Sequence, residues 1–434
     1  MSFELPALPE GWTFSPLDHC AVPGSISYGV VQPGSPVKRG VPIIRVNNFS
    51  DARLDLSDVM HVAPEVEAKY GRTRLSGGEV LLTLVGSVGR VAEVPKACAG
   101  FNVARAVGVI KPANGIDAKW IAICLRSPLS QHLLGSRANT TVQTTINLKD
   151  VRALPIPIPP LAERKLISDF ITALDDRITL LRETNATLEV IAQALFKSWF
   201  VDFDPVRAKR QGLAPAGMDE ATAALFPDNF EESTLGQVPK GWKVRALDEV
   251  ATYLNGLALQ KFPPSEDSWL PVIKIAQLRK GDTDGADRAG KNIKPEYVVQ
   301  NGDVLFSWSG SLEVEVWCGG VGALNQHLFK VTSKEFSKWF YLLWTRHHLD
   351  HFRQIAASKA TTMGHIQRVH LTEAKVLVPP ASMLNAVDAC FASLLDRRIE
   401  NELQAQTLAT LRYTLLPRLI SGQLRLPEAE ALAA

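Results

Sequence analysis

The sequence predicts an α+β protein with two β-rich domains, each followed by a long helix. The two helices are expected to pair as an antiparallel coiled coil with approximate twofold symmetry. Three observations lead to this fold class. The chain has 434 residues, enough for two to four domains. It contains one unit of about 220 residues twice, and an apolar repeat with heptad spacing follows the β-rich part of the first unit.

The composition is that of a folded protein with balanced charge. Hydrophobic residues make up 46% and charged residues 21% of the chain, which is ordinary for a globular protein. The 47 Lys and Arg against 45 Asp and Glu leave a net charge of +2. This excludes a histone-like positive surface and restricts any nucleic-acid site to a local patch. The 5 cysteines form no Cys-x-x-Cys pair, and neither a secretory signal nor a membrane-length apolar run is present. These features predict a soluble protein of the cytoplasm.

The duplication is visible as matched segments that keep the same order along the chain. The matches are Leu8–Trp12 with Val238–Trp242, Val41–Val46 with Leu270–Ile275, Gly78–Leu81 with Gly302–Leu305, Lys119–Trp120 with Lys338–Trp339, Pro159–Pro160 with Pro379–Pro380, and Leu174–Ile178 with Leu395–Ile399. So many ordered matches are not chance, and the two copies should share one architecture.

The first part of each copy carries strand signals and one short buried helix. Apolar and polar residues alternate over Ile44–Asn47 and Ile273–Ile275, as in a half-buried strand. Strands are also expected at Val80–Leu82 and His327–Val331, and short buried helices at Lys119–Cys124 and Trp339–Trp344. Each first part is therefore predicted to be a mixed, β-rich domain.

The second part of each copy is predicted to be a long helix. In the first copy the seam residues step by four and three without Gly or Pro, so about 40 residues would form a rod of roughly 60 Å. The expected seam is Ile167, Ile171, Leu174, Ile178, Leu181, Leu188, Leu195 and Trp199, with Asn185 and Ala192 in the same register, facing Phe391, Leu395, Ile399, Leu411 and Leu415 of the less regular second helix. A single amphipathic helix on a globular core is the alternative. Asn185 could set the register or could be a tolerated surface substitution.

An acidic segment joins the two copies. Residues 211–239 contain no Lys or Arg and carry five acidic residues, namely Asp219, Glu220, Asp228, Glu231 and Glu232. The simplest interpretation is a solvated linker. The alternative is an acidic strip that faces a protein partner and stays away from DNA.

A search for catalytic motifs finds none. The three Pro-Pro sites lack the preceding acid or amide and the following aromatic of an adenine methyltransferase loop. Gly285–Asn292 resembles a phosphate-binding loop but ends in Asn where Ser or Thr would hold magnesium. His347, His348 and His351 lack the glutamate of a metalloprotease helix, and Glu65-x-Glu67 has no convincing upstream acid. No catalytic residue and no metal site is therefore expected.

Both copies do share polar residues that are suited to nucleic acid. Arg45 aligns with Lys274 and Asn48 with Gln277; Arg and Lys can bind guanine, and Asn and Gln can bind adenine, in the major groove. The full set of candidate DNA contacts is Arg45, Asn47, Asn48, Arg72, Arg74, Arg90, Arg105, Thr141, Lys274, Gln277, Arg279, Lys280, Asn325, Gln326, His327, Thr361 and Thr362. Taken singly each charge is more typical of a solvated surface, whereas as a set on a duplicated domain they favour DNA.

Four segments resemble the specificity subunit of type I restriction–modification enzymes. They are Pro155–Glu163 (PIPIPPLAE), Ala194–Pro205 (ALFKSWFVDFDP), Leu235–Trp242 (LGQVPKGW) and Leu415–Leu424 (LLPRLISGQL). The similarity covers nearly the whole chain in the order domain, helix, domain, helix. One departure is Pro380–Leu384 (PASML), which stands where the first copy has Pro160–Arg164 (PLAER). It leaves open whether both helix starts contact partners identically.

The resemblance implies a non-catalytic DNA-binding subunit with two target-recognition domains, each for one half of a split duplex site. It also implies two methyltransferase subunits that bring S-adenosylmethionine and ATP-dependent, magnesium-dependent restriction subunits, with no cofactor on this chain. The expected divisions are 1–158 for recognition domain 1, 159–203 for helix 1, 204–236 for the acidic linker, 237–378 for recognition domain 2, 379–424 for helix 2 and 425–434 for the tail.

Antiparallel helices would place the two domains in inverted orientations, which match the local twofold symmetry of duplex DNA. The rod would then fix the gap between the half-sites. Two other interpretations remain. One is a nuclease or methyltransferase acting alone, against which the missing motifs argue; the other is a coiled-coil scaffold with two protein-binding domains.

Overall fold

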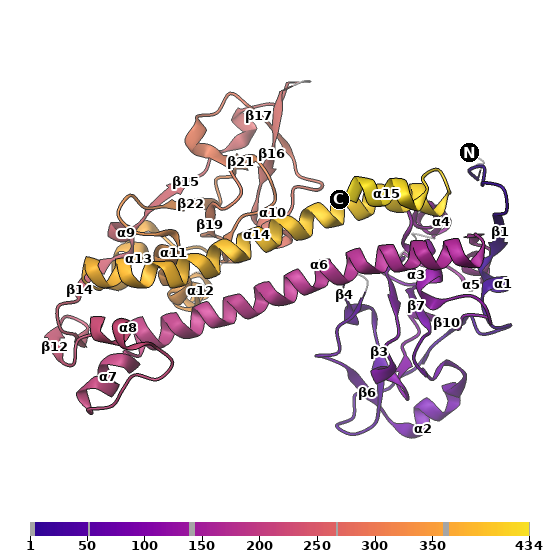
Figure 1. Cartoon of the computed structure of the whole chain (residues 1–434), viewed down its shortest axis with the longest axis horizontal. Coiled ribbons are helices and arrows are strands. Elements are labelled where there is room, and N and C mark those ends of the chain that lie inside the picture. Colours follow the sequence, from indigo (N-terminus) through magenta and orange to yellow (C-terminus); the bar gives the residue numbers. More distant parts are fainter. Residues whose placement is uncertain (1–4, 51–52, 139–143, 266–267, 359–363, 434) are drawn as a thin grey trace. The chain divides into compact units, whose positions relative to one another are not determined.

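The computed structural model describes residues 5–50, 53–138, 144–265, 268–358 and 364–433. The chain divides into two compact units: unit 1 comprises Met1–Thr179 with Gln406–Ala434, and unit 2 comprises Leu180–Ala405. Two long helices, α6 (Leu161–Phe196) and α14 (Ala381–Ile420) (Figure 1), each contribute one section to unit 1 and one to unit 2. Each unit therefore holds one β-rich domain and a section of both helices.

Unit 1 contains a four-stranded sheet in the order β2-β10-β7-β8, a three-stranded sheet in the order β6-β3-β9, and the pairs β1–β11 and β4–β5. Its strands are β1 (Thr13–Pro16), β2 (Ser27–Tyr28), β3 (Val41–Ile44), β4 (Phe49–Ser50), β5 (Arg53–Leu54), β6 (Met60–Val62), β7 (Val80–Thr83), β8 (Val91–Glu93), β9 (Asn102–Val103), β10 (Val107–Ile110) and β11 (Pro155–Ile158). Its other helices are α1 (Leu17–Cys20), α2 (Pro64–Glu67), α3 (Ala118–Arg126), α4 (Pro128–Arg137), α5 (Leu148–Arg152) and α15 (Leu426–Ala433).

Unit 2 repeats this plan with the sheets β15-β22-β19-β20 and β17-β16-β21-β18 and the pairs β14–β23 and β12–β13. Its strands are β12 (Phe230–Ser233), β13 (Gly236–Pro239), β14 (Lys243–Ala246), β15 (Thr252–Asn255), β16 (Trp269–Ile273), β17 (Arg288–Gly290), β18 (Val298–Val299), β19 (Val304–Ser307), β20 (Val314–Val316), β21 (Gly322–Leu324), β22 (Leu328–Thr332) and β23 (Lys375–Val378). Its helices are α7 (Asp204–Arg210), α8 (Glu220–Leu225), α9 (Leu247–Val250), α10 (Ile275–Lys280), α11 (Lys338–His347), α12 (Leu349–Ser358) and α13 (Arg368–Glu373).

The matching sheet orders confirm the duplication and the α+β fold class. Each unit has one parallel pair, which is β3 with β9 in the three-stranded sheet of unit 1 and β16 with β21 in the sheet β17-β16-β21-β18 of unit 2. The predicted strands at β7 and β22 and the predicted buried helices at α3 and α11 are all present. The two copies thus place corresponding residues at corresponding points of one framework.

The strand predicted through Ile44–Asn47, and its counterpart through Ile275, is wrong beyond its first residue. β3 ends at Ile44 and β16 ends at Ile273, and a helical turn follows each strand. The Asn48 side chain accepts a hydrogen bond from the backbone N–H of Arg45 at 2.9 Å, and the Gln277 side chain accepts one from that of Lys274 at 3.3 Å. These caps stabilise the first turn and end the strand.

In unit 1 the start of α6 and the end of α14 run antiparallel. Ile167, Ile171 and Leu174 share a core with the residues Leu415, Leu416, Leu419 and Ile420 of α14. Glu163 forms an ion pair with Arg425, and Asp175, later in α6, forms one with Arg412, which comes earlier in the chain than Arg425. The two segments therefore run in opposite directions. None of the helices among the described residues is long and apolar enough to span a membrane.

In unit 2 the end of α6 pairs antiparallel with the start of α14. Asn185, which is buried, donates to the backbone oxygen of Arg398 at 3.0 Å and accepts a hydrogen bond from Asn401, also at 3.0 Å. The heptad pattern pointed to Asn185 but not to Asn401. A buried polar pair of this kind favours one register, because shifting either helix would leave both amides unsatisfied.

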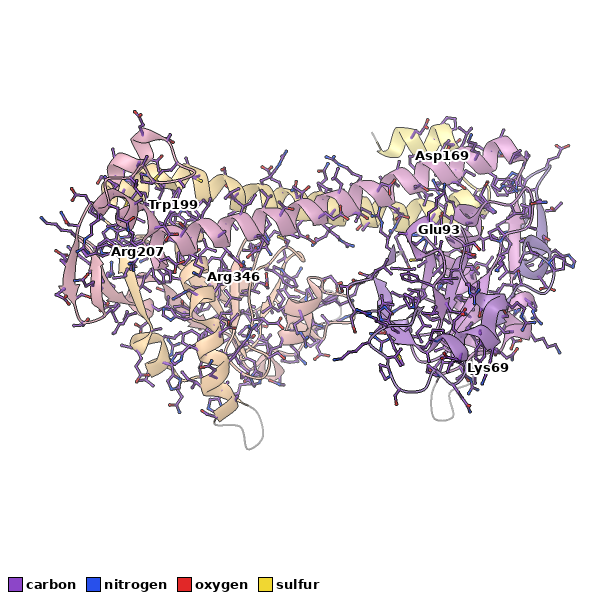
Figure 2. The ribbon with its side chains drawn as sticks, turned by 90° about the horizontal axis from the view of Figure 1, so that it is seen from below. Lys69, Glu93, Asp169, Trp199, Arg207 and Arg346 are labelled. Carbon is purple, nitrogen blue, oxygen red and sulfur yellow. The ribbon has the colours of Figure 1, made fainter. Side chains whose placement is uncertain are left out.

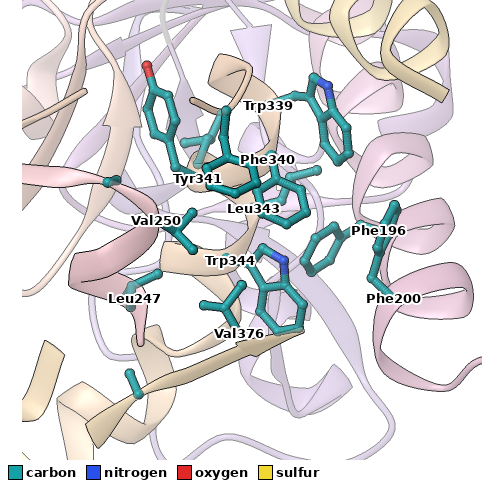
Figure 3. Close-up of a cluster of buried hydrophobic side chains, with 14 of the residues drawn as sticks. Phe196, Phe200, Leu247, Val250, Trp339, Phe340, Tyr341, Leu343, Trp344 and Val376 are labelled. Carbon is teal, nitrogen blue, oxygen red and sulfur yellow. The ribbon is translucent and has the colours of Figure 1, made fainter. Parts of the chain in front are cut away.

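Aromatic side chains attach the end of α6 to the β-rich domain of unit 2. Phe196 packs edge-on against Trp344 of α11 with ring centroids 5.1 Å apart, and Phe200, which is fully buried, lies 6.2 Å from Phe340 (Figure 3). Trp199 packs against Phe391 of α14 at 5.6 Å. Trp199 and Phe200 belong to the helical turn Lys197–Val201 that continues α6. The end of α6 therefore packs against both α11 and α14.

The predicted seam residues differ in burial. Buried ones are Ile167, Ile171, Leu174, Ile178, Leu181, Trp199, Phe391, Leu395 and Leu415, whereas Leu188, Leu195, Ile399 and Leu411 are half-buried. The acidic segment is partly folded, and its five acidic residues are exposed, as a solvated linker predicts. It contributes α8 and the β12–β13 hairpin, and its Phe226 is buried with its ring 5.7 Å from that of Trp199.

The two helix starts are built differently, as the departure in the sequence suggested. In unit 1, Glu163 accepts a hydrogen bond from Trp12 Nε1 at 3.0 Å and also pairs with Arg425. In unit 2 the equivalent of Glu163 is Met383, and among the described residues the buried Nε1 of Trp242 has no partner. The charged Glu163 at the helix start of unit 1 is thus replaced in unit 2 by the apolar Met383.

An arginine from each β-rich domain is bound to the helix pair of its own unit; we call these contacts the arginine clasps. In unit 1, Arg126 of α3 donates to Asp175, which Arg412 of α14 also contacts. In unit 2, Arg346 of α11 pairs with Glu189 of α6 and with Glu315 at 2.9 Å (Figure 2). The clasps fix each domain to both helices at a defined point.

Both acids of the unit 2 clasp are shared between two arginines. Arg398 of α14 lies 3.2 Å from Glu189 and 3.2 Å from Glu315. Burial, and then the neighbouring Arg398, lower the pKa of Arg346 to about 9, so this guanidinium is still protonated at neutral pH. The four side chains together form a charge-balanced cluster.

Replacing Arg346 with Met should destabilise unit 2 by about 3 kcal/mol, because it removes one partner from a largely buried ionic cluster. Urea denaturation monitored by tryptophan fluorescence measures the loss. Arg397→Met is the matched control, since Arg397 pairs with Glu400 on the surface with two thirds of its side chain exposed, and should cost less than about 1 kcal/mol. Equal losses in the two variants would show that the clasp contributes no more than a surface pair.

Candidate nucleic-acid interface

The candidate site in each unit is the edge at which two parallel strands end; we call it the strand-end edge. In unit 1, β3 ends next to Arg45 and β9 ends two residues before Arg105. Because the strands are parallel neighbours, their carboxyl ends meet at the same edge of the sheet. The backbone N–H of Ala104 donates to the oxygen of Ile44 at 2.8 Å, which ties the two ends together.

Unit 2 has the same edge, with Lys274 after β16 and Gln326 two residues after β21. The backbone N–H of Asn325 donates to the oxygen of Ile273 at 3.2 Å, as that of Ala104 does to Ile44 in unit 1. The predicted pairs Arg45 with Lys274, and Asn48 with Gln277, therefore do occupy equivalent positions. Arg105 and Gln326, which were predicted without being aligned, are a further equivalent pair.

One glycine in each unit allows a third chain segment to approach the edge. A Cβ on Gly29 would lie 1.9 Å from the oxygen of Val103, and a Cβ on Gly256 would lie 2.2 Å from the oxygen of Asn325. Any side chain would push the segments apart. These two glycines therefore maintain the backbone path that carries Arg105 and Gln326.

Two of the predicted DNA contacts act as caps. Asn48 is buried, and its amide donates to the backbone oxygens of Asp55 at 3.0 Å and Asp58 at 2.8 Å in addition to capping Arg45. A contact between Asn48 and a base would have to break these bonds. Gln277 caps Lys274 and is half-buried.

Several predicted cations at or near the edge are paired with acids. Arg45 lies 3.2 Å from Asp58, and Lys274 forms an ion pair with Asp287. Arg279 pairs with Glu313 at 3.0 Å. Lys280 pairs with Asp282, and this hydrogen bond raises the pKa of Lys280. All four cations remain at least partly exposed, so a phosphate could compete for them.

The remaining cations of unit 1 have different surroundings. Arg74 donates to the buried carboxylate of Glu67 at 2.9 Å, and this hydrogen bond holds the pKa of Glu67 below its usual value. Arg90 is exposed and donates to the backbone oxygen of Phe49 at 3.1 Å. Arg72 and Asn47 are exposed. Arg74 and, through its bond to Phe49, Arg90 therefore contact the fold, whereas Arg72 and Asn47 are exposed to solvent.

A polar aromatic cluster surrounds Gln326 in unit 2, and sequence reasoning missed most of it. Trp308 Nε1 donates to the side-chain oxygen of Asn255 at 2.9 Å and to the backbone oxygen of Gln326 at 3.1 Å. The hydroxyl oxygen of Ser309 lies 2.9 Å from Nδ1 of His327, within hydrogen-bond distance. The predicted residue Asn325 is buried and accepts a hydrogen bond from the backbone of His327 at 3.2 Å.

Three predicted contacts lie outside the described residues, and the described residues form no metal-binding cluster. Thr141, Thr361 and Thr362 lie outside the described residues. His348 donates to the backbone oxygen of Lys375, and burial lowers the pKa of His348 to about 4, so it is neutral at pH 7. Among the described residues no group of three or more His, Cys, Asp or Glu side chains could hold a metal ion. The exposed polar groups at the strand-end edges can bind a ligand.

Comparison with known families agrees with this picture. The profile described as "Type I restriction modification DNA specificity domain" matches residues 37–190 and again residues 239–409. The two matched segments cover the β-rich domain and much of the following helix of each copy.

Similar proteins carry the same description. The HindI specificity subunit of Haemophilus influenzae is 25% identical over 337 residues, covering 67% of this chain and 72% of that protein. The MjaIX specificity subunit of Methanocaldococcus jannaschii is 22% identical over 360 residues, covering 81% and 78%. The crystal structure of the type I restriction–modification S subunit from M. genitalium covers 96% of this chain and 99% of its own, with a TM-score of 0.56 at 13% identity, and so shares its fold.

Replacing Gly29 with Ala should destabilise unit 1 by about 1–3 kcal/mol, because the added methyl overlaps the backbone at the strand-end edge. Thermal denaturation followed by circular dichroism measures the loss. Gly135→Ala in α4 of the same unit is the control: its Cβ would meet nothing within 4 Å, so this variant should be neutral or slightly more stable. A Gly29 variant as stable as the control would contradict the close approach.

Proposed function

Because the chain belongs to the family of type I restriction–modification DNA specificity subunits, we propose that each unit recognises one half of a split DNA site and that the paired helices set the gap between the halves. The observation that supports this most directly is the strand-end edge. One backbone framework presents polar side chains twice, and those side chains differ between the copies. Two half-sites of different sequence require such an arrangement.

The helices support the role of a spacer. Their pairing is antiparallel within each unit, held in unit 2 by Asn185 and Asn401, as a spacer between two inverted recognition domains would require. Inverted domains suit the local twofold symmetry of duplex DNA. The proposed divisions are those expected from the sequence, with residues 159–203 and 379–424 as spacer helices and 204–236 as an acidic connection.

The proposal assigns chemistry to other subunits. Two methyltransferase subunits would supply S-adenosylmethionine, and restriction subunits would supply ATP-dependent translocation and magnesium-dependent cleavage. This chain would bind no cofactor directly and would act in the cytoplasm, where it meets duplex DNA. The candidate contacts at the strand-end edges, together with the exposed Arg72 and Arg90, would provide base and phosphate contacts.

The decisive experiment is co-expression of the full chain with its methyltransferase subunit, followed by mapping of methylated adenines. A recognition sequence with two specified segments and an unspecified gap is the expected result. A chain that binds no duplex at low salt, even with the methyltransferase subunit present, would instead be a scaffold. Methylation or cleavage by the purified chain alone would make it an enzyme.

Removing residues 176–182 from α6 together with residues 404–410 from α14 should shorten the gap by about three base pairs, since seven helical residues span roughly 10 Å. The deletion keeps Asp175 with Arg412 and Asn185 with Asn401, and a whole heptad preserves the helix faces. Adenine mapping of the co-expressed complex measures the gap. Deleting 176–182 alone should abolish specific methylation, because the helices would no longer match in length. An unchanged gap in the double deletion would show that the helices do not set it.

A further inference from the structure

Arg105 in unit 1 and Gln326 in unit 2 occupy the same backbone position. The backbone N–H of Arg105 donates to the oxygen of Val30 at 2.8 Å, and that of Gln326 donates to the oxygen of Leu257 at 2.9 Å. The preceding residues form equivalent parallel bridges, Ala104 with Val30 and Asn325 with Leu257. The glycine next to each bridge, Gly29 or Gly256, makes the same close approach.

The two side chains differ in chemistry and are both available. Arg105 is exposed, and among the described residues its guanidinium has no hydrogen-bond or ionic partner. Gln326 is half-buried. In the described part of the chain its amide contacts Nε2 of His327 at 3.4 Å, which is longer than a normal hydrogen bond. By contrast, Arg45 and Lys274 at the same edge are engaged by acids.

The surroundings hold Gln326 in a fixed position. Trp308 donates to the backbone oxygen of Gln326, and His327 is oriented by Ser309. In unit 1 the positions of Trp308, Ser309 and His327 are taken by the apolar Leu84, Val85 and Ala106, as the strand registers show. Because these residues are apolar, Arg105 is the polar side chain at this position of the strand-end edge in unit 1. A rigidly held position suits specific recognition, because little order has to be gained on binding.

We infer that Arg105 and Gln326 are equivalent base-recognition residues, with Arg105 selecting guanine in one half-site and Gln326 selecting adenine in the other. Arginine can donate two hydrogen bonds to guanine O6 and N7, and glutamine can donate to N7 and accept from N6 of adenine. This inference rests on the proposed function. Beyond the proposed function, the inference names the residue of each unit that distinguishes the two half-sites, and the base that each residue selects.

The test exchanges the two residues in the full chain, co-expressed with the methyltransferase subunit. Gln326→Arg should replace adenine by guanine at one position of one half-site, and Arg105→Gln should replace guanine by adenine in the other. Each preference should change by about tenfold or more. The half-site recognised by the unmodified unit is an internal control. Gln326→Glu is a second variant of the same size, and should select cytosine, whose N4 amino group donates to a carboxylate.

Arg177→Gln removes the same charge from an exposed position of α6 and should leave both half-sites unchanged. Gel-shift measurements on duplexes that carry each of the four base pairs at the affected position provide a readout independent of methylation. Weaker binding without any change of base preference would overturn the inference and make both residues phosphate contacts. If the wild type recognises a split site and the variants keep its base preferences, the inference is refuted while the proposed function stands. Absence of a split site in the wild type refutes the proposed function.

Discussion

The arginine clasps are the contacts on which the arrangement of each unit depends. A β-rich domain can recognise DNA at a defined place only if it is held rigidly on the helices that carry it. Phe196 and Phe200 belong to the large buried apolar cluster of unit 2, but apolar packing alone tolerates small rotations. Charged hydrogen bonds from Arg346 to Glu189 and Glu315 are directional, so they define the angle at which α11 meets the helix pair.

The two copies show which features a duplicated framework keeps and which it changes. The strand order, the parallel pair at the edge and the close glycine are kept, because they determine the backbone path. The side chains at the edge, the clasp acids and the helix starts have changed: Asp175 serves unit 1 and Glu189 serves unit 2, and Met383 stands in the place of Glu163. Conserved backbone with altered chemistry is what a pair of related recognition domains with different targets requires.

Much of the fold could be predicted because its signals are periodic and local. The heptad spacing of Ile167 to Leu181 indicated the helix, and the ordered repeats indicated the shared architecture. The site was harder to predict, because its members come from segments far apart in the chain. Asn48 looked like a base contact, since its role as a cap depends on backbone groups that only the fold brings together. Trp308 and Asn255 gave no sequence signal, and Arg346 could not be distinguished from a surface charge on α11.

The shared acids of the clasps affect how such proteins could be recombined. Glu189 belongs to the helix encoded before the second recognition domain, whereas its partner Arg346 is encoded within that domain. A chimera joined between them would therefore inherit the arginine from one parent and the acid from another. If the new helix lacked the acid, a desolvated guanidinium would lose a counter-ion and the transplanted domain would tilt or unfold. A hybrid should thus keep the pair only where the junction falls upstream of residue 189, so that the domain is transferred together with the end of its supporting helix.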